Sequence, residues 1–362
     1  MQIDLSKINQ EEFVVREREI ASDKCYLVFP KGVPTWSKDN LIYRSSIWNE
    51  EGKPVSLSFP KFFNYTEKPD LYPNPAKHKD YNILAKEDGS ALIISVYKGE
   101  LICRTRGVFD ASEHENGFEI NVLKEKYPEV FKISNFNEDV TYIYEWVSDN
   151  QRIVLKYDNC PDIYLIGAIS HEDYSLIPQH VLDNYASLFK VKRPKYYKFD
   201  SLQECANAIK SLEGVEGVCL YYNNDQNIIK LKSDWFLKLF HMKSELASIE
   251  KVIDLFLQLN RPSFIGFYDF VARNLDFEIA NQVRGELSRV CDADKEVNEI
   301  LLGMKKFLEK IINLPTRKEQ AKIIIESYGN TNRASFVFKL LDKKNLDKDD
   351  IKKLLFQVLK NE

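Results

Sequence analysis

The chain has 362 residues, of which 44% are hydrophobic and 29% charged, and its formal net charge is −4. This length predicts two or three domains, and the slightly acidic balance excludes nucleic-acid binding through an overall positive field, so that any such binding needs a local basic surface. No stretch has the length and apolarity of a membrane span, and the first residues lack the pattern of a signal sequence.

The first 65 residues are predicted to be rich in strands after a short helical start. Apolar runs separated by turn residues indicate strands over 24–29, 40–48 and 55–59. A loop with three prolines, 67–80, then leads to the next strand, because proline prevents a regular element from continuing.

A lysine at a turn, Lys86, is the centre of the following stretch. Apolar runs over 81–84, 91–97 and 101–107 predict three consecutive strands, which we interpret as a β-meander. The segment Lys86-Glu87-Asp88-Gly89-Ser90 forms an acidic turn after the first of these strands. A lysine in this place can project into a cleft and act as a nucleophile once it loses its proton.

Strand and helix patterns continue to about residue 232. We predict helices over 118–126 and 201–212, the second of which stops near Gly214. Further strands are predicted over 141–147, 152–157 and 163–168, and a hairpin is predicted from strands 216–222 and 227–232.

From about residue 233, helical periodicity replaces strand alternation. A helix over 301–312 ends at Pro315, and a capping box from Thr316 to Glu319 begins the next helix. Residues 349–360 predict a terminal amphipathic helix. We therefore place a domain boundary near residue 240, between a strand-rich part over 1–240, which includes the strand-rich portion 1–65, and an all-helical part over 241–362.

Cysteines and histidines do not predict a metal centre. The six cysteines form no C-x-x-C pair, and the five histidines form no cluster at metal-ligand spacing. The cysteines are interpreted as small apolar residues in a reducing, cytoplasmic compartment.

Attack by Lys86 on a nucleoside triphosphate would need several further groups. The amine has to be neutral, and nearby cations lower the pKa of an amine by repulsion. The phosphates need cations, and a divalent metal needs carboxylates. The sequence offers Lys230 with Lys232 and Arg104 with Arg106 as cations that share a strand face, and Glu145 and Glu216 as acids in apolar strands.

Taken singly, each of these residues has a plainer explanation. Two lysines in a K-x-K pattern are more commonly a solvated sheet face, and Glu145 and Glu216 are as readily structural ion-pair partners. Taken together, the order K-E-D-G-S, R-T-R-G, Y-E-W, E-G-V and K-L-K favours a shared site.

This order of motifs resembles the covalent nucleotidyltransferase superfamily over about 40–240, and most closely the ATP-dependent phage RNA ligase 1 family. The segment from Lys86 to Ser90 matches the nucleophile motif of that family. Three other stretches resemble it: K-F-F-N at 61–64, R-I-V-L at 152–155 and K-x-K-S-D-W at 230–235.

The resemblance implies a role for each matching residue. Lys86 would attack the α-phosphorus of ATP and carry AMP, with the backbone of Ala85 against the adenine. Asp88 would help to place Lys86 and the later nucleophile. Glu145 would contact the nucleotide or the metal, and Glu216 would bind the metal, which would be Mg²⁺ or Mn²⁺. The cations that would bind phosphates and support pyrophosphate departure are Arg44, Lys61, Arg106, Lys230 and Lys232.

Two positions depart from the family pattern. Arg106 stands where the family often has lysine, and it keeps the charge but binds phosphate as a planar fork. Lys31 lies near the place of a nucleotide-contacting tyrosine in a related ligase, so that role stays unassigned.

The implied fold is α+β, with an antiparallel-sheet nucleotidyltransferase domain of ATP-grasp-like ligase type followed by an all-α domain. The helical domain would contact the RNA substrate. Ordinary solvated helix faces are the commoner explanation for most of its basic residues, among which the candidates are Lys243, Lys251, Arg273, Arg284 and Arg289.

The implied function is an ATP-dependent RNA ligase, expected to be a monomer, that joins RNA ends carrying a 5′-phosphate and a 3′-hydroxyl. Lys86 would be adenylylated, AMP would pass to the 5′-phosphate, and the 3′-hydroxyl would then attack. A DNA ligase or a GTP-dependent capping enzyme is an alternative, but those are expected to carry a small β-barrel after the K-x-K strand. A non-catalytic RNA-binding protein on the same fold is the alternative from another class. The natural RNA, a nicked tRNA or another, stays open.

Overall fold

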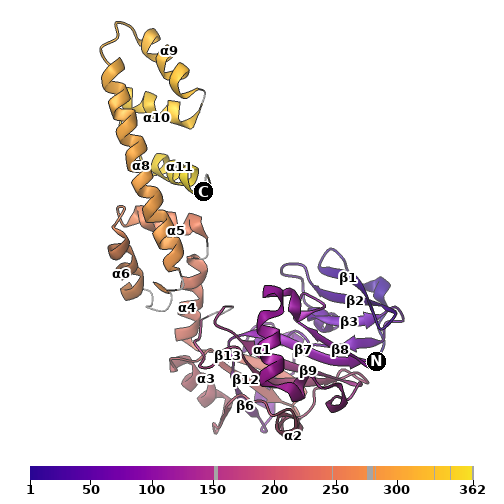
Figure 1. Cartoon of the computed structure of the whole chain (residues 1–362). Coiled ribbons are helices and arrows are strands. Elements are labelled where there is room, and N and C mark those ends of the chain that lie inside the picture. The colour runs from indigo at the N-terminus through magenta and orange to yellow at the C-terminus, as the bar shows by residue number, and fades with distance from the viewer. Residues whose placement is uncertain are drawn as a thin grey trace. The chain divides into compact units, whose positions relative to one another are not determined.

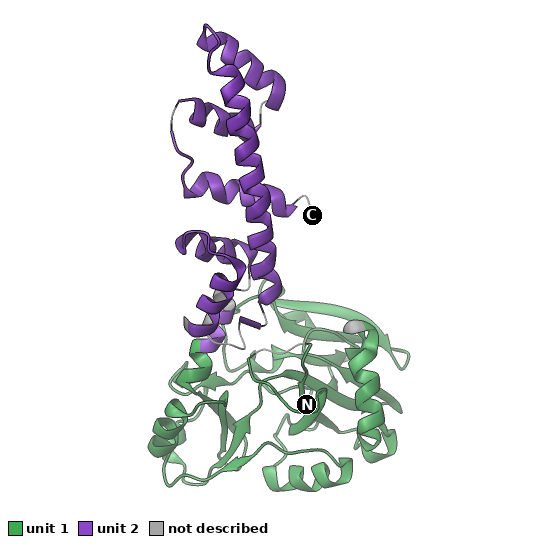
Figure 2. Cartoon of the chain, turned by 60° about the vertical axis from the view of Figure 1, so that its left-hand side comes forward, with its two compact units in different colours: residues 1–238 green, residues 239–362 purple. Residues whose placement is uncertain are grey.

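The computed structural model describes residues 1–150, 154–246, 248–274, 280–281, 283–329, 331–342 and 344–360. Two units divide the chain, Met1–Lys238 and Leu239–Glu362 (Figure 2). The first unit carries three sheets, and the regular elements of the second are helices (Figure 1). No helix in the described ranges is long and apolar enough to cross a membrane.

An antiparallel sheet of four strands in chain order begins the first unit. Its strands are β1 (Phe13–Ile20), β2 (Asp23–Pro30), β3 (Ser46–Asn49) and β4 (Pro54–Ser56). The prediction of a strand over 40–48 is wrong in its first half, because Leu41–Arg44 forms a 3-10 turn and the strand begins only at Ser46. The predicted strand 55–59 is likewise cut short at Ser56. β1 was not predicted, because its alternating charges, R-E-R-E, hide the apolar period.

The second sheet has the strand order β10-β9-β7-β8 and is antiparallel throughout. Apolar residues of its outer face pack against two helices in one core cluster. Its inner face contributes Ile93, Ile143 and Ile169 to another cluster, which also contains Leu84 and Tyr221 of the third sheet. The elements are β7 (Ser90–Tyr97), β8 (Glu100–Arg104), β9 (Val140–Val147) and β10 (Asp162–Ser170), with the helices α1 (Phe118–Lys126) and α2 (Gln179–Phe189).

The third sheet has the order β11-β6-β12-β13-β5, and its β13–β5 pair is parallel. One face packs on helix α3 (Leu202–Ser211), whose N-cap is Ser201. The other face meets the inner face of the second sheet through the shared core cluster. The strands are β5 (Phe63–Asn64), β6 (Asn82–Lys86), β11 (Tyr196–Tyr197), β12 (Gly217–Tyr222) and β13 (Asn227–Lys232).

The predicted β-meander around Lys86 is wrong. β6 pairs with β11 and β12, whereas β7 and β8 belong to the second sheet. The segment between Lys86 and Ser90 is therefore a crossover between two packed sheets. Gly89 is required there, because a Cβ atom on it would lie 2.3 Å from the carbonyl oxygen of Trp146.

The strand predicted over 152–157 is not found where the structure describes it. Residues 152 and 153 lie outside the described residues, and 154–157 are irregular. The N–H groups of Val154 and Leu155 donate to the Asp88 carboxylate instead of to a neighbouring strand. The predicted helices over 118–126 and 201–212 and the hairpin that ends at Lys232 are confirmed to within one or two residues.

Helix α8 (Arg284–Ile311) is the longest element of the second unit, and α5, α6, α10 and α11 contact it. The N-cap half of the predicted capping box is confirmed, since the Glu319 N–H donates to Thr316 Oγ1 at 3.3 Å. Helix α4 (Asp234–Glu245) contains the boundary between the units. The other helices are α5 (Ile249–Gln258), α6 (Phe264–Asn274), α9 (Arg317–Tyr328), α10 (Asn332–Leu341) and α11 (Lys348–Lys360).

Candidate active site

Lys86, Glu216 and Lys232 form the centre of the candidate site. Lys86 ends β6, and the pairing places Lys86, Gly217 and Lys232 side by side on three neighbouring strands. Glu216, only 3% exposed, accepts from Lys86 Nζ at 2.9 Å through Oε2 and pairs with Lys232 Nζ at 2.8 Å through Oε1. Gly217 allows this approach, because a Cβ on it would lie 1.9 Å from the Leu231 carbonyl oxygen.

The charges around Lys86 keep it protonated. Burial alone would lower the pKa of the amine, but the carboxylates of Glu216 and Glu145 outweigh it and raise the pKa above its ordinary value. The expectation that neighbouring cations lower the pKa of Lys86 is therefore wrong for this arrangement, because the carboxylates dominate. Lys86 can become a nucleophile only when its pairing with Glu216 is relieved.

Glu145 is a second acid in the site, and its side chain is half-buried. Burial raises its pKa to about 7, against the opposing effect of Lys86, and the nearby Glu216 adds to the rise. Its Oε1 accepts the N–H of Gly89 at 3.0 Å, which ties β9 to the crossover. Within the described ranges no three His, Cys, Asp or Glu side chains are grouped for a metal ion. The carboxylates of Glu145, half-buried, and Glu216, buried, repel each other and offer hard oxygen donors, and they fit a Mg²⁺ or Mn²⁺ ion that takes its remaining ligands from phosphate and water.

Four cations form what we call the cation cluster: Arg44, Lys61, Arg106 and Lys230. Burial lowers the pKa of Lys230 to about 8, with further contributions from Lys61 and Arg44. Burial and the charge of Arg106 lower the pKa of Arg44 to about 10, and the pKa of Lys61 is lowered by burial and Arg44. In the part of the chain that the structure describes, no carboxylate forms an ion pair with any of these four side chains. The cluster thus has the charge to bind a polyanion.

Aromatic rings support the cation cluster. Phe62 lies between two of its members, with Arg44 Cζ at 4.8 Å and Lys230 Nζ at 5.7 Å from the ring centroid. Lys61 Nζ lies 5.2 Å from the Phe63 ring and 5.8 Å from the Trp36 ring. The rings offer negative π faces that offset part of the repulsion between the cations. The sequence interpretation missed Trp36. It gave Phe62 no separate role, although Phe62 belongs to the K-F-F-N stretch that resembles the family.

Asp88 acts on the backbone in this structure. Its Oδ2 accepts the N–H groups of Val154 at 2.7 Å and Leu155 at 2.8 Å, and its own N–H donates to Tyr157 Oη at 2.7 Å. These bonds fasten residues 154–157 to the turn after Lys86. Asp88 therefore places Lys86 only indirectly, through the shape of the turn. Tyr157 was missed, and no motif spacing pointed to it.

Arg104 does not join the site. It is fully buried and donates to Ser45 and Ser56, so it braces the first sheet. The strand β8 ends at Arg104, and the predicted pairing of Arg104 with Arg106 on one strand face is wrong. The Ala85 N–H already donates to the Lys195 carbonyl at 2.7 Å. The predicted adenine contact of Ala85 would therefore use other atoms of its backbone.

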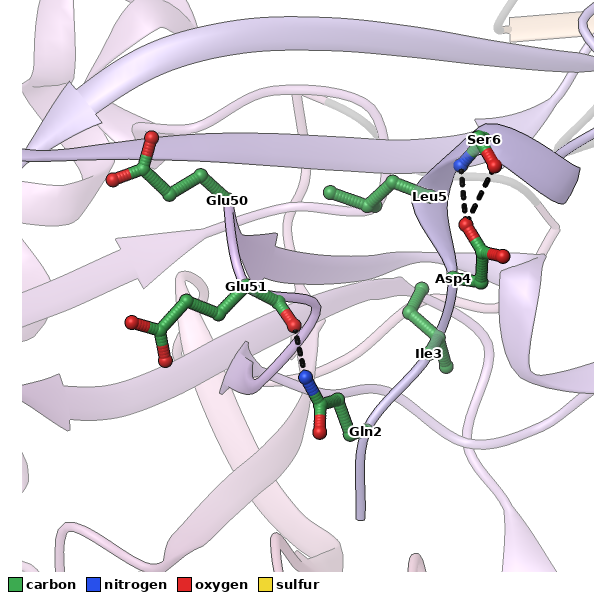
Figure 3. A pocket seen from close by; sticks show the side chains of 7 residues that line it. All are labelled: Gln2, Ile3, Asp4, Leu5, Ser6, Glu50 and Glu51. Atoms are coloured by element: carbon green, nitrogen blue, oxygen red, sulfur yellow. Dashed lines mark hydrogen bonds between the residues drawn. The ribbon is translucent and has the colours of Figure 1, made fainter.

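A hollow of about 620 Å³ lies elsewhere in the first unit, beside the N-terminus (Figure 3). Its carboxylates are those of Asp4, Glu50 and Glu51, and the last two side chains extend away from Asp4. Acidic groups repel phosphates, so this hollow does not suit a nucleotide. No predicted site residue lines it.

A family model described as RNA ligase matches residues 44–246, which contain every residue predicted for the nucleotide site. The chain belongs to the RNA ligase family. It is 26% identical over 283 residues to the "Putative bifunctional polynucleotide kinase/RNA ligase" of Autographa californica nuclear polyhedrosis virus, covering 72% of this chain and 39% of that protein. It is 24% identical over 216 residues to the "Putative RNA ligase" of Thermovibrio ammonificans, covering 58% and 56%.

This RNA ligase family member thus spans about two fifths and just over half of the lengths of those two relatives. Among solved structures, an archaeal ATP-dependent RNA ligase is similar at 15% identity and a TM-score of 0.45, covering 75% of this chain and 72% of that one.

Proposed function

We propose that this protein is an ATP-dependent RNA ligase that joins a 5′-phosphate end to a 3′-hydroxyl end through AMP carried on Lys86. Membership in the RNA ligase family supports the reaction class. The observation that carries the nucleotide chemistry is the placement of the partly buried Lys86 beside the cation cluster, with which no carboxylate of the described residues forms an ion pair. In this proposal the first unit is the adenylyltransferase domain, of the ATP-grasp-like ligase type, and the second contacts RNA.

The cation cluster would bind the triphosphate. Arg44 and Arg106 offer planar forks for phosphate oxygens, while Lys61 and Lys230 offer point charges. The Lys86 nitrogen would form a bond to the α-phosphorus as the bond from that phosphorus to the bridging oxygen breaks and pyrophosphate leaves. Lys230 and Lys232 would offset the charge that develops on the leaving group.

Glu145 and Glu216 are the residues that would hold Mg²⁺ or Mn²⁺. When bound, the ion supplies positive charge beside the two carboxylates and the phosphates. Lys86 needs this added positive charge, because Glu216 raises the pKa of Lys86 as long as no cation compensates the charge of Glu216. Glu216 thus couples nucleotide loading to activation of the amine.

The later steps would reuse the same residues. AMP passes from Lys86 to the 5′-phosphate of one RNA end, and the 3′-hydroxyl of the other end then attacks that phosphate and releases AMP. Because each step transfers a phosphoryl-type group, positioning and charge stabilisation by the cation cluster serve all of them.

Covalent labelling tests the proposal. Incubation with ATP and magnesium should add AMP to the peptide that contains Lys86, as mass spectrometry reads it. Lys86→Arg should abolish the adduct, and the exposed control Lys77→Arg should keep it. Labelling by GTP instead of ATP, or ligation of DNA ends but not RNA ends, would favour the alternative enzymes, and no labelling at all would favour a binding protein.

Glu216→Gln tests the metal assignment. The variant keeps the size of the side chain and should need a much higher magnesium concentration for half-maximal adduct formation. An unchanged magnesium dependence would show that Glu216 is only the structural partner of Lys86 and Lys232.

A further inference from the structure

Helix α6 of the second unit has two apolar faces, and only one of them builds the core. Phe267 and Val271 are fully buried, and the Phe267 ring packs 5.4 Å from the Phe256 ring of α5. Phe264 and Ile265 precede that face, and Ile265 is 72% exposed. The core of the unit therefore does not account for the outer aromatic residues of α6.

These outer residues line a hollow of about 230 Å³ with the first residue of α8. Its lining consists of Phe264, Ile265, Tyr268 and Arg284. The Phe264 and Tyr268 rings, one helical turn apart, have centroids 6.2 Å apart. Tyr268 Oη donates to Asn281 Oδ1 at 2.6 Å, which fixes the orientation of the ring.

The charge in this hollow is positive. The Arg284 guanidinium lies 6.0 Å from the Phe264 centroid and 5.9 Å from the Tyr268 centroid. Arg284 is exposed, and no carboxylate in the described ranges forms an ion pair with it. The N-cap Val283 offers no polar side chain, and no side chain among the described residues caps the first N–H groups of α8, so these donors add to the preference for an anion.

Aromatic rings next to an exposed arginine are suited to one ligand chemistry. Unpaired bases stack on aromatic rings and on guanidinium planes, and the phosphate of the same nucleotide pairs with the cation. An apolar helix of a protein partner would fill the hollow but would leave Arg284 without an anion. We propose that Phe264, Tyr268 and Arg284 bind one unpaired nucleotide of the RNA substrate, with its base against the rings and its phosphate at Arg284. This inference rests on the proposed function in taking RNA as the substrate.

Binding of a fluorescently labelled single-stranded RNA oligonucleotide to the full-length protein, followed by anisotropy, tests this site. Replacing both rings in Phe264→Leu/Tyr268→Leu should weaken binding on the order of tenfold, the typical effect of losing one stacked base. Arg284→Gln should weaken binding and flatten its dependence on salt. The control is Lys295→Gln on α8, the helix that Arg284 begins, because the 78% exposed Lys295 side chain pairs with Asp292 outside the hollow.

The readouts separate the two proposals. AMP labelling of Lys86 reports on the proposed function, and it should stay at the level of the unaltered chain in all of these variants. RNA binding unchanged in both the ring variant and Arg284→Gln would overturn the site, whatever the labelling shows. If circular dichroism shows that the leucine variant is misfolded, RNA binding by the surface variant Arg284→Gln alone decides whether the site exists. An equal loss on duplex RNA without unpaired bases would also overturn the stacking of an unpaired base.

Discussion

At the scale of single residues, the candidate site contains two acids, Glu145 and Glu216, and the separate cation cluster. Glu216 holds Lys86 and Lys232 at 2.9 and 2.8 Å, while the cation cluster has no described carboxylate as a partner. The same burial raises the pKa of Glu145 and lowers that of Lys230. Two groups of opposite type therefore titrate close to neutral pH.

These two groups predict a bell-shaped pH dependence of kcat/KM for ATP in adduct formation. The rate constant should rise through about pH 7 as Glu145 ionises and should fall above about pH 8 as Lys230 loses its proton. Lys230→Arg should remove the alkaline fall, because arginine keeps its charge. An alkaline limb that persists in Lys230→Arg would assign it to another group.

Phe62 supplies a second prediction at this scale. Removing its ring in Phe62→Leu takes away two cation contacts, each worth about 0.5–2 kcal/mol. KM for ATP should therefore rise several-fold or more, with a smaller change in kcat, whereas Phe62→Tyr keeps the ring and should behave like the unaltered chain. Equal losses in the leucine and tyrosine variants would show that Phe62 matters for packing alone.

At the scale of elements, the sequence predicts the contents of the site better than its construction. Lys86, Glu145, Glu216, Lys230 and Lys232 lie on the predicted strands or directly beside them, because alternation and turn residues mark those strands. The assembly of two sheets across the turn after Lys86 was beyond prediction, because strand partners in the third sheet come from distant parts of the chain. Arg44 was expected on a strand, and instead it ends a 3-10 turn, whose Ile42 carbonyl accepts from Tyr174 Oη, a partner far along the chain that leaves no local pattern.

The bonds from Asp88 to the backbone predict a role for the segment 154–157. Asp88→Ala removes the acceptor of the Val154 and Leu155 N–H groups, and a buried donor that loses its acceptor costs about 1–3 kcal/mol. Hydrogen exchange at Val154 and Leu155 should therefore speed up together with a loss of adduct formation. Asp4→Ala is the control, because Asp4 caps an exposed turn by accepting the Ser6 N–H. Unchanged exchange in Asp88→Ala would show that these two amides find other partners.

At the scale of the whole molecule, the proposed chemistry divides between two units. Every nucleotide-site candidate precedes residue 233, and the aromatic hollow with Arg284 belongs to the second unit. The family match ends at residue 246, just after helix α4. Residues 1–246 are therefore the natural portion with which to test whether the first unit works alone.

A chain that ends at residue 246 should still form the AMP adduct but should join RNA ends poorly. It keeps helix α4 whole, and with it Phe236, whose ring lies 4.8 Å from Lys232 Nζ. Circular dichroism and a monomeric elution profile are the controls for folding. A well-folded short chain that forms no adduct would make the second unit part of the nucleotide site. Ligation equal to that of the full chain would remove the second unit from RNA recognition.

The ion pair between Lys86 and Glu216 also affects how the amine of Lys86 is protected from side reactions when no nucleotide is bound. An ammonium group has no lone pair, so acyl phosphates, aldehydes and other cellular electrophiles that damage amines find little to react with at Lys86. The ligase proposed here would wait in a chemically inert form, and its working lifetime would depend on how rarely the amine is released without a phosphate to attack.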